Sequence, residues 1–204
     1  YICYTTPQEE PELSELRRSL EGCTDWSHAA SVMPESMSFE RVMAQALAGG
    51  EDWKGAISAL PSNLQMMFVH AYQSYLFNEM LSERMARGLP LNAPVEGDVV
   101  IPLSADGIPN HDDAIVATGR NLDLVARQVR VGRAFVTGAL YGSETVLAEG
   151  EPGEIERSMA ERNDLVPEDF VIPGLSKCSS KGGRREILCL SLIHISEPTR
   201  PEPI

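Results

Sequence analysis

A short basic segment in the last part of the chain combines residue types that bind phosphate. Lys177, Lys181, Arg184 and Arg185 lie within nine residues, in the stretch SKCSSKGGRRE. Its serines and glycines can expose backbone N–H groups, and N–H groups beside cations suit the phosphates of a nucleic acid. The alternatives are a solvated segment that leads into a hairpin, or arginines that pair with the surplus carboxylates of the chain, because most surface charge clusters bind nothing specific.

Four arginines form a second cationic set in the middle of the chain: Arg120, Arg127, Arg130 and Arg133. Arg127 and Arg130 are three residues apart, so they share one face of the helix that we expect over residues 122–131. Arginines near the carboxyl end of a helix also stabilise it through the helix dipole. The pattern therefore leaves two interpretations open, contact with nucleic acid and stabilisation of the helix.

A third set of polar residues lies in a helix that is otherwise apolar. The helix expected over residues 64–87 is apolar almost all round from residue 64 to residue 81 and turns polar only at its end, and such a helix is normally buried on every face. A buried hydrogen-bonding group without a partner costs roughly 1–3 kcal/mol. These side chains therefore either bond to neighbouring backbone, which we favour, or line a functional site. They are His70, Tyr72, Gln73, Tyr75 and Asn78.

The overall composition excludes several classes of protein. The 204 residues include 30 acidic and 17 basic side chains, and the net charge of −13 disfavours indiscriminate binding to nucleic acid or to anionic membranes. No run of about 18 apolar residues occurs, so we expect no membrane span. The motifs of nucleotide-binding loops, zinc proteases and serine hydrolases are also missing from the sequence.

Cysteine and histidine spacings indicate neither a metal site nor disulfides. Cys3, Cys23, Cys178 and Cys189 form no CxxC pair, so they suit a reducing compartment, and we expect a cytoplasmic protein. The histidines form no pair at ligand spacing, and nothing in the sequence orients a cysteine–histidine nucleophile. We therefore expect no metal site.

Hydrophobic periodicity predicts a mixture of helices and strands that favours an α+β fold. One amphipathic helix is predicted by a stripe of apolar residues, Phe39, Val42, Met43, Ala46 and Leu47. Further helices are expected at residues 13–20, 53–60, 64–87, 122–131 and 153–165. Strands are expected at residues 98–103, 113–118, 133–140 and 186–190.

Several long blocks of this sequence occur, in the same order, in a known family. They are LPSNLQMMFVHAYQSYLFNEMLSERMARGLPLN, VEGDVV, TGRNLDLVARQVRVGRAFVTGALYGSET, EGEPGEIE and LSKCSSKGGRREI. With these blocks the chain resembles the TruD family of tRNA pseudouridine synthases, most closely in its archaeal form. The resemblance covers about residues 38–190, and HAYQSYLFN and SSKGGRRE are its most specific matches.

The resemblance implies a reaction and a partner. Such enzymes isomerise a uridine of tRNA to pseudouridine, as tRNA pseudouridine(13) synthases: the N-glycosidic bond is cut, the uracil turns, and its carbon 5 joins the ribose. An aspartate acts on the ribose as nucleophile or base, and the target base leaves its stack to reach it. The implied partner is tRNA or another structured RNA, and neither a metal nor an organic cofactor is implied.

The resemblance also implies a domain organisation. The family has an α+β catalytic domain with a mixed sheet, into which an α+β TRUD domain is inserted. Residues 61–87 are then expected to be a helix of the catalytic domain, preceded by a helical segment over residues 1–60. Residues 88–172 are expected to be the insertion, and residues 173–191 the return to the catalytic domain. We expect residues 192–204 to be a non-native tail, because LIHISEPTRPEPI resembles a translated adaptor sequence.

Two motifs of the resemblance carry the expected site residues. The cations of the basic segment match the pattern SSKGxRR or adjoin it, and we expect them to contact RNA or to support the catalytic pocket; they are Lys177, Lys181, Arg184 and Arg185. Gln73 and Asn78 match the pattern HAYQSYLFN, and we expect them to steady the active-site cleft.

No catalytic residue is assigned. The catalytic aspartate of the family lies in a GxKD motif, and neither this motif nor the family's NxFGxQRFG segment occurs in the chain. We therefore expect a C-terminal fragment of an enzyme that is inactive alone. The alternative is a non-catalytic module that binds RNA or protein through the TRUD domain. A third interpretation is an unrelated acidic domain that binds other proteins. It would require the ordered matches to the family to be a coincidence.

Overall fold

The computed structural model describes residues 2, 3 and 5–188 of the chain. The chain divides into two compact units, of which unit 1 comprises residues 1–72 and 171–180. Unit 2 comprises residues 73–170 and 181–204. The expected tail over residues 192–204 lies outside the described residues, and the expected domain boundaries stay predictions.

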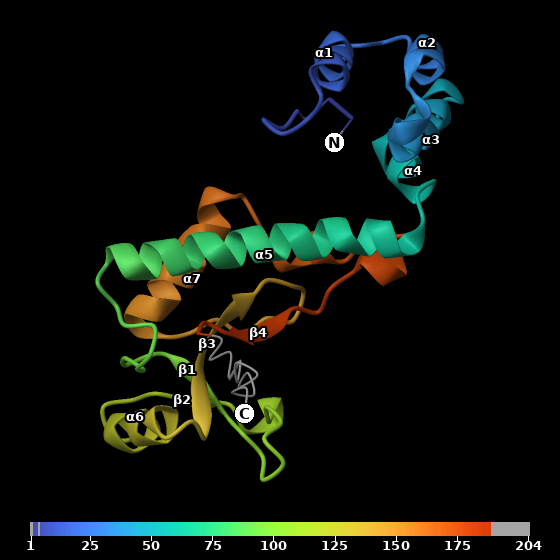
Figure 1. Cartoon of the computed structure of the whole chain (residues 1–204). Helices are drawn as coiled ribbons and strands as arrows, with labels where there is room; N and C mark the ends of the chain where they lie inside the picture. Colours follow the sequence, from blue (N-terminus) through green and yellow to red (C-terminus); the bar gives the residue numbers. More distant parts are fainter. Residues whose placement is uncertain (1, 4, 189–204) are drawn as a thin grey trace, which may run out of the picture. The chain divides into compact units, whose positions relative to one another are not determined.

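Unit 1 is built from short helices. Asp25 accepts a hydrogen bond from the backbone N–H of His28 at 3.0 Å, and Asp52 accepts one from Gly55 at 2.7 Å. Each aspartate satisfies a backbone donor that the first turn of a helix leaves unpaired. The elements are α1 (Pro11–Ser19), α2 (Trp26–Val32), η1 (Glu35–Met37), α3 (Ser38–Ala48), α4 (Trp53–Ser58) and η4 (Ser176–Cys178) (Figure 1).

An aromatic pair lies beside the core of unit 1, with Trp53 61% exposed. The rings of Trp26 and Trp53 meet edge to face, with centroids 5.5 Å apart. This geometry is favourable for aromatic rings because the positive edge of one faces the negative face of the other. The buried apolar residues of this core are Ile2, Leu20, Ala29, Met33, Met37, Met43, Ala44, Ala56 and Leu60.

The buried side of α3 differs from the expected stripe. Phe39 and Val42 are 42% and 38% exposed, whereas Glu40 and Met43 are each 5% exposed. Glu40 is buried because Arg17 of α1 donates to its carboxylate over 2.7 Å. The ion pair therefore turns the Glu40 edge of α3 inward, which the apolar pattern did not indicate.

The longest helix, α5 (Ser62–Ala86), contributes to both units (Figure 1). The sequence predicts that it is buried on every face, and this prediction is wrong. Leu76 is fully buried, but Met67, Tyr75 and Met85 are 60%, 52% and 55% exposed. The described residues pack against only part of the helix surface. No helix of the described part is long and apolar enough to cross a membrane.

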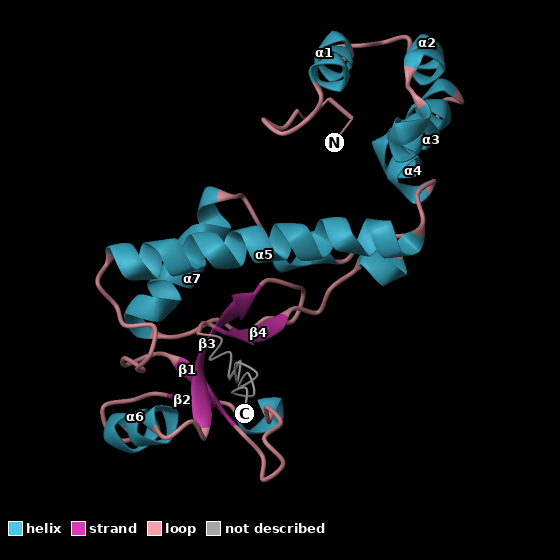
Figure 2. Ribbon diagram, in the orientation of Figure 1, coloured by secondary structure: helices cyan, strands magenta, loops and turns pink. Residues whose placement is uncertain are grey.

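Unit 2 contains a four-stranded antiparallel sheet with the strand order β2-β1-β3-β4 (Figure 2). Its strands are β1 (Val99–Pro102), β2 (Ile115–Val116), β3 (Ala134–Leu140) and β4 (Gly183–Glu186). The mixture of helices and strands agrees with the expected α+β fold, although every pairing among the described strands is antiparallel. The last strand begins three residues earlier than predicted, so it contains both arginines of the basic segment.

Besides α5, two helices accompany this sheet. They are α6 (Leu122–Arg130) and α7 (Gly150–Arg162), with short helical turns at η2 (His111–Asp113) and η3 (Pro167–Phe170). The helix expected over residues 153–165 corresponds to α7, which buries one of its faces, including Ile155, Glu156 and Met159. The core of unit 2 consists of Leu76, Phe77, Met80, Val100, Val125, Ala134, Val136, Ala139, Tyr141, Ile155, Met159, Phe170 and Ile187.

Candidate functional site

Most of the basic segment lies in β4 and in the turn before it. Arg184 and Arg185 are opposite Ala139 and Gly138 of β3. Successive side chains of a strand point to opposite faces of the sheet. The two neighbouring arginines therefore have different surroundings.

Arg184 is buried, and each of its donors has an acceptor. Its side chain is 8% exposed. Nε donates to Thr137 Oγ1 at 2.8 Å, and Nη2 donates to the Thr137 carbonyl at 2.9 Å. Nη1 donates to the Val146 carbonyl at 2.9 Å, and both terminal nitrogens donate to Glu156 at 3.3 and 2.7 Å. A guanidinium has five N–H donors. These five bonds therefore leave none for a phosphate, and Arg184 supports the surrounding structure.

Glu156 of α7 completes this network. Besides Arg184, its carboxylate accepts hydrogen bonds from the backbone N–H groups of Ala139 at 3.0 Å and Ala148 at 2.6 Å. A buried ion pair is tolerated when such additional bonds satisfy the remaining oxygen lone pairs. Glu156 thus connects α7 to β3 and β4. Sequence reasoning missed it, although an acidic residue among the apolar positions of an amphipathic helix was a usable signal.

Tyr141 joins the same network at the end of β3. Its hydroxyl donates to the backbone carbonyl of Glu156. Burial raises the pKa of the Tyr141 hydroxyl above its ordinary value, and the nearby Glu156 carboxylate raises it further, while Arg184 opposes both. The Tyr141 carbonyl accepts a hydrogen bond from Gln73 Nε2 at 2.5 Å. Gln73 therefore ties α5 to the end of β3, and its bond to backbone agrees with the favoured interpretation of this residue.

Asn78 does not share the environment of Gln73. Gln73 is 6% exposed, whereas Asn78 is exposed. The two residues are five positions apart in α5, and at 3.6 residues per turn they lie on different faces. Only Gln73 is thus placed to position the buried network.

The other two cations of the segment in unit 2 remain accessible. Arg185 is exposed, and its Cζ atom lies 5.3 Å from the centroid of the Phe77 ring, at a distance suited to a cation–π contact. Lys181 pairs with Glu144 at 3.1 Å, but the two side chains are 78% and 64% exposed. Ion pairs this exposed are weak. Both cations can therefore exchange their present contacts for a phosphate.

Two glycines determine the course of the chain beside Lys181. A Cβ atom on Gly142 would lie 2.0 Å from the backbone nitrogen of Gly182, and Gly182 itself has φ +75. The Glu144 N–H also donates to the Lys181 carbonyl at 2.9 Å. The backbone at Gly142 and the backbone at Gly182 can thus approach this closely only because neither residue has a side chain. This close approach fixes the position of the Lys181 backbone.

Lys177 belongs to unit 1, unlike the other three cations. It is exposed in η4, next to the buried Cys178, whose thiol donates to Gln65 Oε1 at 3.5 Å. The structure therefore brings Lys181, Arg184 and Arg185 into one unit and leaves Lys177 in the other.

A second buried ion pair lies at the end of α5. Arg84 donates to both oxygens of Asp98, at 2.7 and 2.8 Å, and the side chains are 6% and 1% exposed. Arg84 Nε also donates to the Pro90 carbonyl, and the Val95 N–H donates to Asp98. This pair fixes α5 to the start of β1. Within the described residues, no group of three or more His, Cys, Asp or Glu side chains is suited to hold a metal ion.

The chain is similar to one known family over nearly its whole length. The family described as tRNA pseudouridine synthase D (TruD) matches residues 1–198. A protein of Natronomonas pharaonis named probable tRNA pseudouridine synthase D is 47% identical over 192 residues, and a Halobacterium salinarum protein of the same name is 40% identical over 198 residues. Each alignment covers 92% of this chain and 44% of the relative.

A solved structure has the same fold. The crystal structure of a Methanosarcina mazei protein described as a putative tRNA pseudouridine synthase D superimposes with a TM-score of 0.85 and 36% sequence identity. The superposition covers 92% of this chain and 43% of that protein. The chain thus spans less than half the length of these relatives.

Proposed function

Because the chain belongs to the tRNA pseudouridine synthase D (TruD) family, we propose that it is part of an enzyme that isomerises a uridine of tRNA to pseudouridine. The observation that carries this proposal is the agreement of sequence and fold with relatives of that name over 92% of the chain. In this reaction the bond from uracil N1 to the ribose breaks. A bond from uracil C5 to the same ribose carbon forms, the hydrogen of C5 is released as a proton, and the freed N1 takes up a proton.

In this proposal the chain contributes contacts to the RNA and the framework behind them. Lys181 and Arg185 of unit 2, and Lys177 of unit 1, are exposed cations that can bind phosphates of tRNA. Arg184 and Gln73 act behind them as positioning residues, through the network of Glu156 and Tyr141. We also propose a cytoplasmic location, on the free thiols of Cys3, Cys23 and Cys178.

A chimera tests the proposed reaction. This chain replaces the aligned segment of the Natronomonas pharaonis relative, and the chimera is incubated with a tRNA transcript that carries tritium at uridine C5. We expect tritium release to water, because C5 loses its hydrogen when it joins the ribose. The control is the unaltered relative. A chimera that is folded by circular dichroism and binds tRNA but releases no tritium contradicts the proposal.

A double substitution tests the proposed RNA contacts. Lys181→Ala with Arg185→Ala in the chimera should raise KM for tRNA and leave kcat nearly unchanged, because both side chains contact solvent and not the buried network. Arg18→Ala with Lys54→Ala removes the same charge from exposed positions of unit 1 and is the matched control. An equal rise of KM in the two double variants would contradict the proposed contacts, because it would show that only the net charge of the protein affects tRNA binding.

A further inference from the structure

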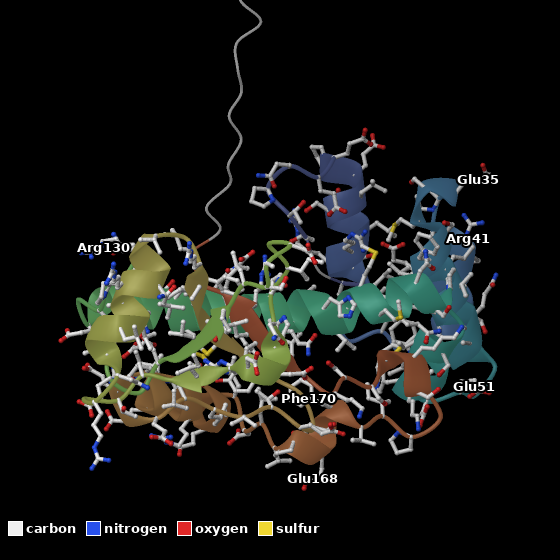
Figure 3. All side chains as sticks on the ribbon, turned by 90° about the horizontal axis from the view of Figure 1, so that it is seen from below. Glu35, Arg41, Glu51, Arg130, Glu168 and Phe170 are labelled. Atoms are coloured by element: carbon white, nitrogen blue, oxygen red, sulfur yellow. The ribbon has the colours of Figure 1, made fainter. Side chains whose placement is uncertain are left out.

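The four arginines in and around α6 are exposed and have no ionic partners among the described residues. Arg120, Arg127, Arg130 and Arg133 are all exposed. None of them pairs with a carboxylate of the described residues within 4.0 Å, and none of their side chains has a hydrogen bond there. Figure 3 labels Arg130 at the end of α6. We call these four side chains the α6 arginine surface.

This lack of partners is informative in an acidic chain. The protein has 30 acidic and 17 basic residues, and most buried or half-buried arginines do pair with a carboxylate. Residues 120–133 contain four arginines and a single acidic residue, Asp123. The Glu96 carboxylate also lies nearby, because it accepts the Gly119 N–H at 3.2 Å. The region around α6 therefore has a positive net charge, although the net charge of the whole protein is negative.

Helix stabilisation does not account for the whole surface. Arg127 and Arg130 lie in the last turn of α6, where the helix dipole favours cations. Arg133 lies beyond the helix. Arg120 precedes the amino end, where the same dipole disfavours a cation. At least Arg120 and Arg133 therefore need another reason for their exposed, unpaired state.

A groove adjoins the α6 arginine surface. Its volume is about 250 Å³, and Arg133 and Gln128 lie at its wall together with the apolar side chains of Leu124 and Ile115. Leu124 and Ile115 are 62% and 40% exposed. The Gln128 amide has no hydrogen-bond partner among the described residues. An apolar floor, a free amide and a cation together match an unpaired nucleobase and its phosphate.

We propose that the α6 arginine surface binds the phosphate backbone of RNA and that the adjoining groove receives an unpaired base. This inference rests on the proposed function, which makes tRNA the partner, and it adds a second contact surface to that of the basic segment. Single-stranded loops of tRNA provide both phosphates and unstacked bases, whereas a regular duplex provides only phosphates.

Salt-dependent binding tests the arginine contacts. The chain and its Arg127→Ala, Arg130→Ala double variant are titrated into a fluorescent tRNA transcript at 50 and 200 mM salt. Each lost phosphate contact lowers the slope of log K against log salt by about 0.7–0.9. The loss of affinity between the two salt concentrations should therefore be roughly tenfold smaller for the double variant. The Arg18→Ala, Lys54→Ala variant should keep the slope of the parent chain.

The outcomes separate this inference from the proposed reaction. The proposal that the α6 arginine surface binds RNA phosphates is overturned by either of two results. One is an unchanged slope of log K against log salt in the folded arginine variant, and the other is an equal change of this slope in the control variant. Neither result depends on tritium release by the chimera. Conversely, an inactive chimera whose RNA binding still depends on Arg127 and Arg130 contradicts the proposed reaction and leaves the binding surface intact.

Competition with two RNAs tests the groove. A hairpin with an unpaired loop should displace the labelled tRNA better than a duplex of equal length. Gln128→Met keeps the side-chain volume and removes the amide, so it should reduce this preference by roughly 2- to 10-fold, as expected for one hydrogen bond. Equal competition by the hairpin and the duplex, or an unchanged preference in Gln128→Met, overturns the groove as a base site.

Discussion

Replacing Glu156 by glutamine should destabilise unit 2 strongly. The substitution keeps the shape of the side chain but removes the charge that faces the buried guanidinium of Arg184, 2.7 Å away. The new amide also directs N–H donors at groups that already donate. The side chains of the pair are 8% and 6% exposed, so water cannot replace the lost carboxylate.

The size of the effect follows from the burial of the pair. Removing one partner of a buried ion pair costs roughly 3–5 kcal/mol. Glu156 also accepts the N–H groups of Ala139 and Ala148, and each of these donors costs about 1–3 kcal/mol if it is left unpaired. Glutamine can satisfy only part of this set. We therefore expect a loss of about 4 kcal/mol, a large part of the 5–15 kcal/mol that is typical of folded domains.

Urea denaturation followed by far-ultraviolet circular dichroism measures this loss. At roughly 2 kcal/mol per molar urea, the transition midpoint should fall by about 2 M. Hydrogen exchange at the amides of Ala139 and Ala148 should accelerate in the same variant. Glu144→Gln removes the charge of an exposed ion pair with Lys181, and this control should change the stability by less than about 1 kcal/mol.

A double-mutant cycle with Arg184→Met identifies the source of the effect. If the pair is coupled as the structure indicates, the double variant loses at least about 1 kcal/mol less than the sum of the single variants. Additive losses, or a midpoint shift of Glu156→Gln no larger than that of Glu144→Gln, refute the reasoning.

Three further predictions concern other contacts. Gly182→Ala should lower the melting temperature by several degrees, because Gly182 has φ +75 and an added Cβ would lie 1.9 Å from Thr145 Oγ1. The control is Gly183→Ala, which should be nearly neutral because an added Cβ there meets no atom within 4 Å. Alkaline unfolding should involve Tyr141. Its pKa is raised in the folded state, so the Tyr141 hydroxyl stays protonated there at a pH at which it ionises in the unfolded chain. Its contribution to the free energy of unfolding is therefore complete below pH 10.0 and falls above it by about 1.4 kcal/mol per pH unit. Tyr141→Phe should remove this decrease from a measurement of stability against pH. Asp98→Asn should cost roughly 3–5 kcal/mol in urea denaturation, because it leaves the buried Arg84 guanidinium without its anion, and a loss below 1 kcal/mol contradicts this.

The sequence predicted elements whose signals are local. The helix expected from residue 122 could be predicted because its apolar period ends at Gly132, and α6 confirms it. The strand expected from residue 133 was confirmed as β3. The strand β4 was placed three residues too late because Gly183–Glu186 shows no apolar alternation. Its pairing with β3 is what makes these polar residues a strand.

The interior of the candidate site could not be predicted in this way. Arg184 and Glu156 are 28 positions apart, and only the fold brings them together. Arg184 and Arg185 look equivalent in the sequence, yet one is buried with all donors used and the other is exposed. Gln73 and Asn78 likewise share one motif but lie on different faces of α5. A motif therefore identified the family, but only the strand and helix faces distinguished the buried residues from the exposed ones.

The edge-to-face pair of Trp26 and Trp53 supplies an optical reporter that needs no label. These are both tryptophans of the chain, and both belong to unit 1. Excitation at the red edge of protein absorption therefore yields emission from unit 1, while the α6 arginine surface belongs to unit 2. A change in this emission when tRNA is added means that unit 1 also responds to the RNA. Constant emission during binding means that the surroundings of the two tryptophans do not respond to the RNA.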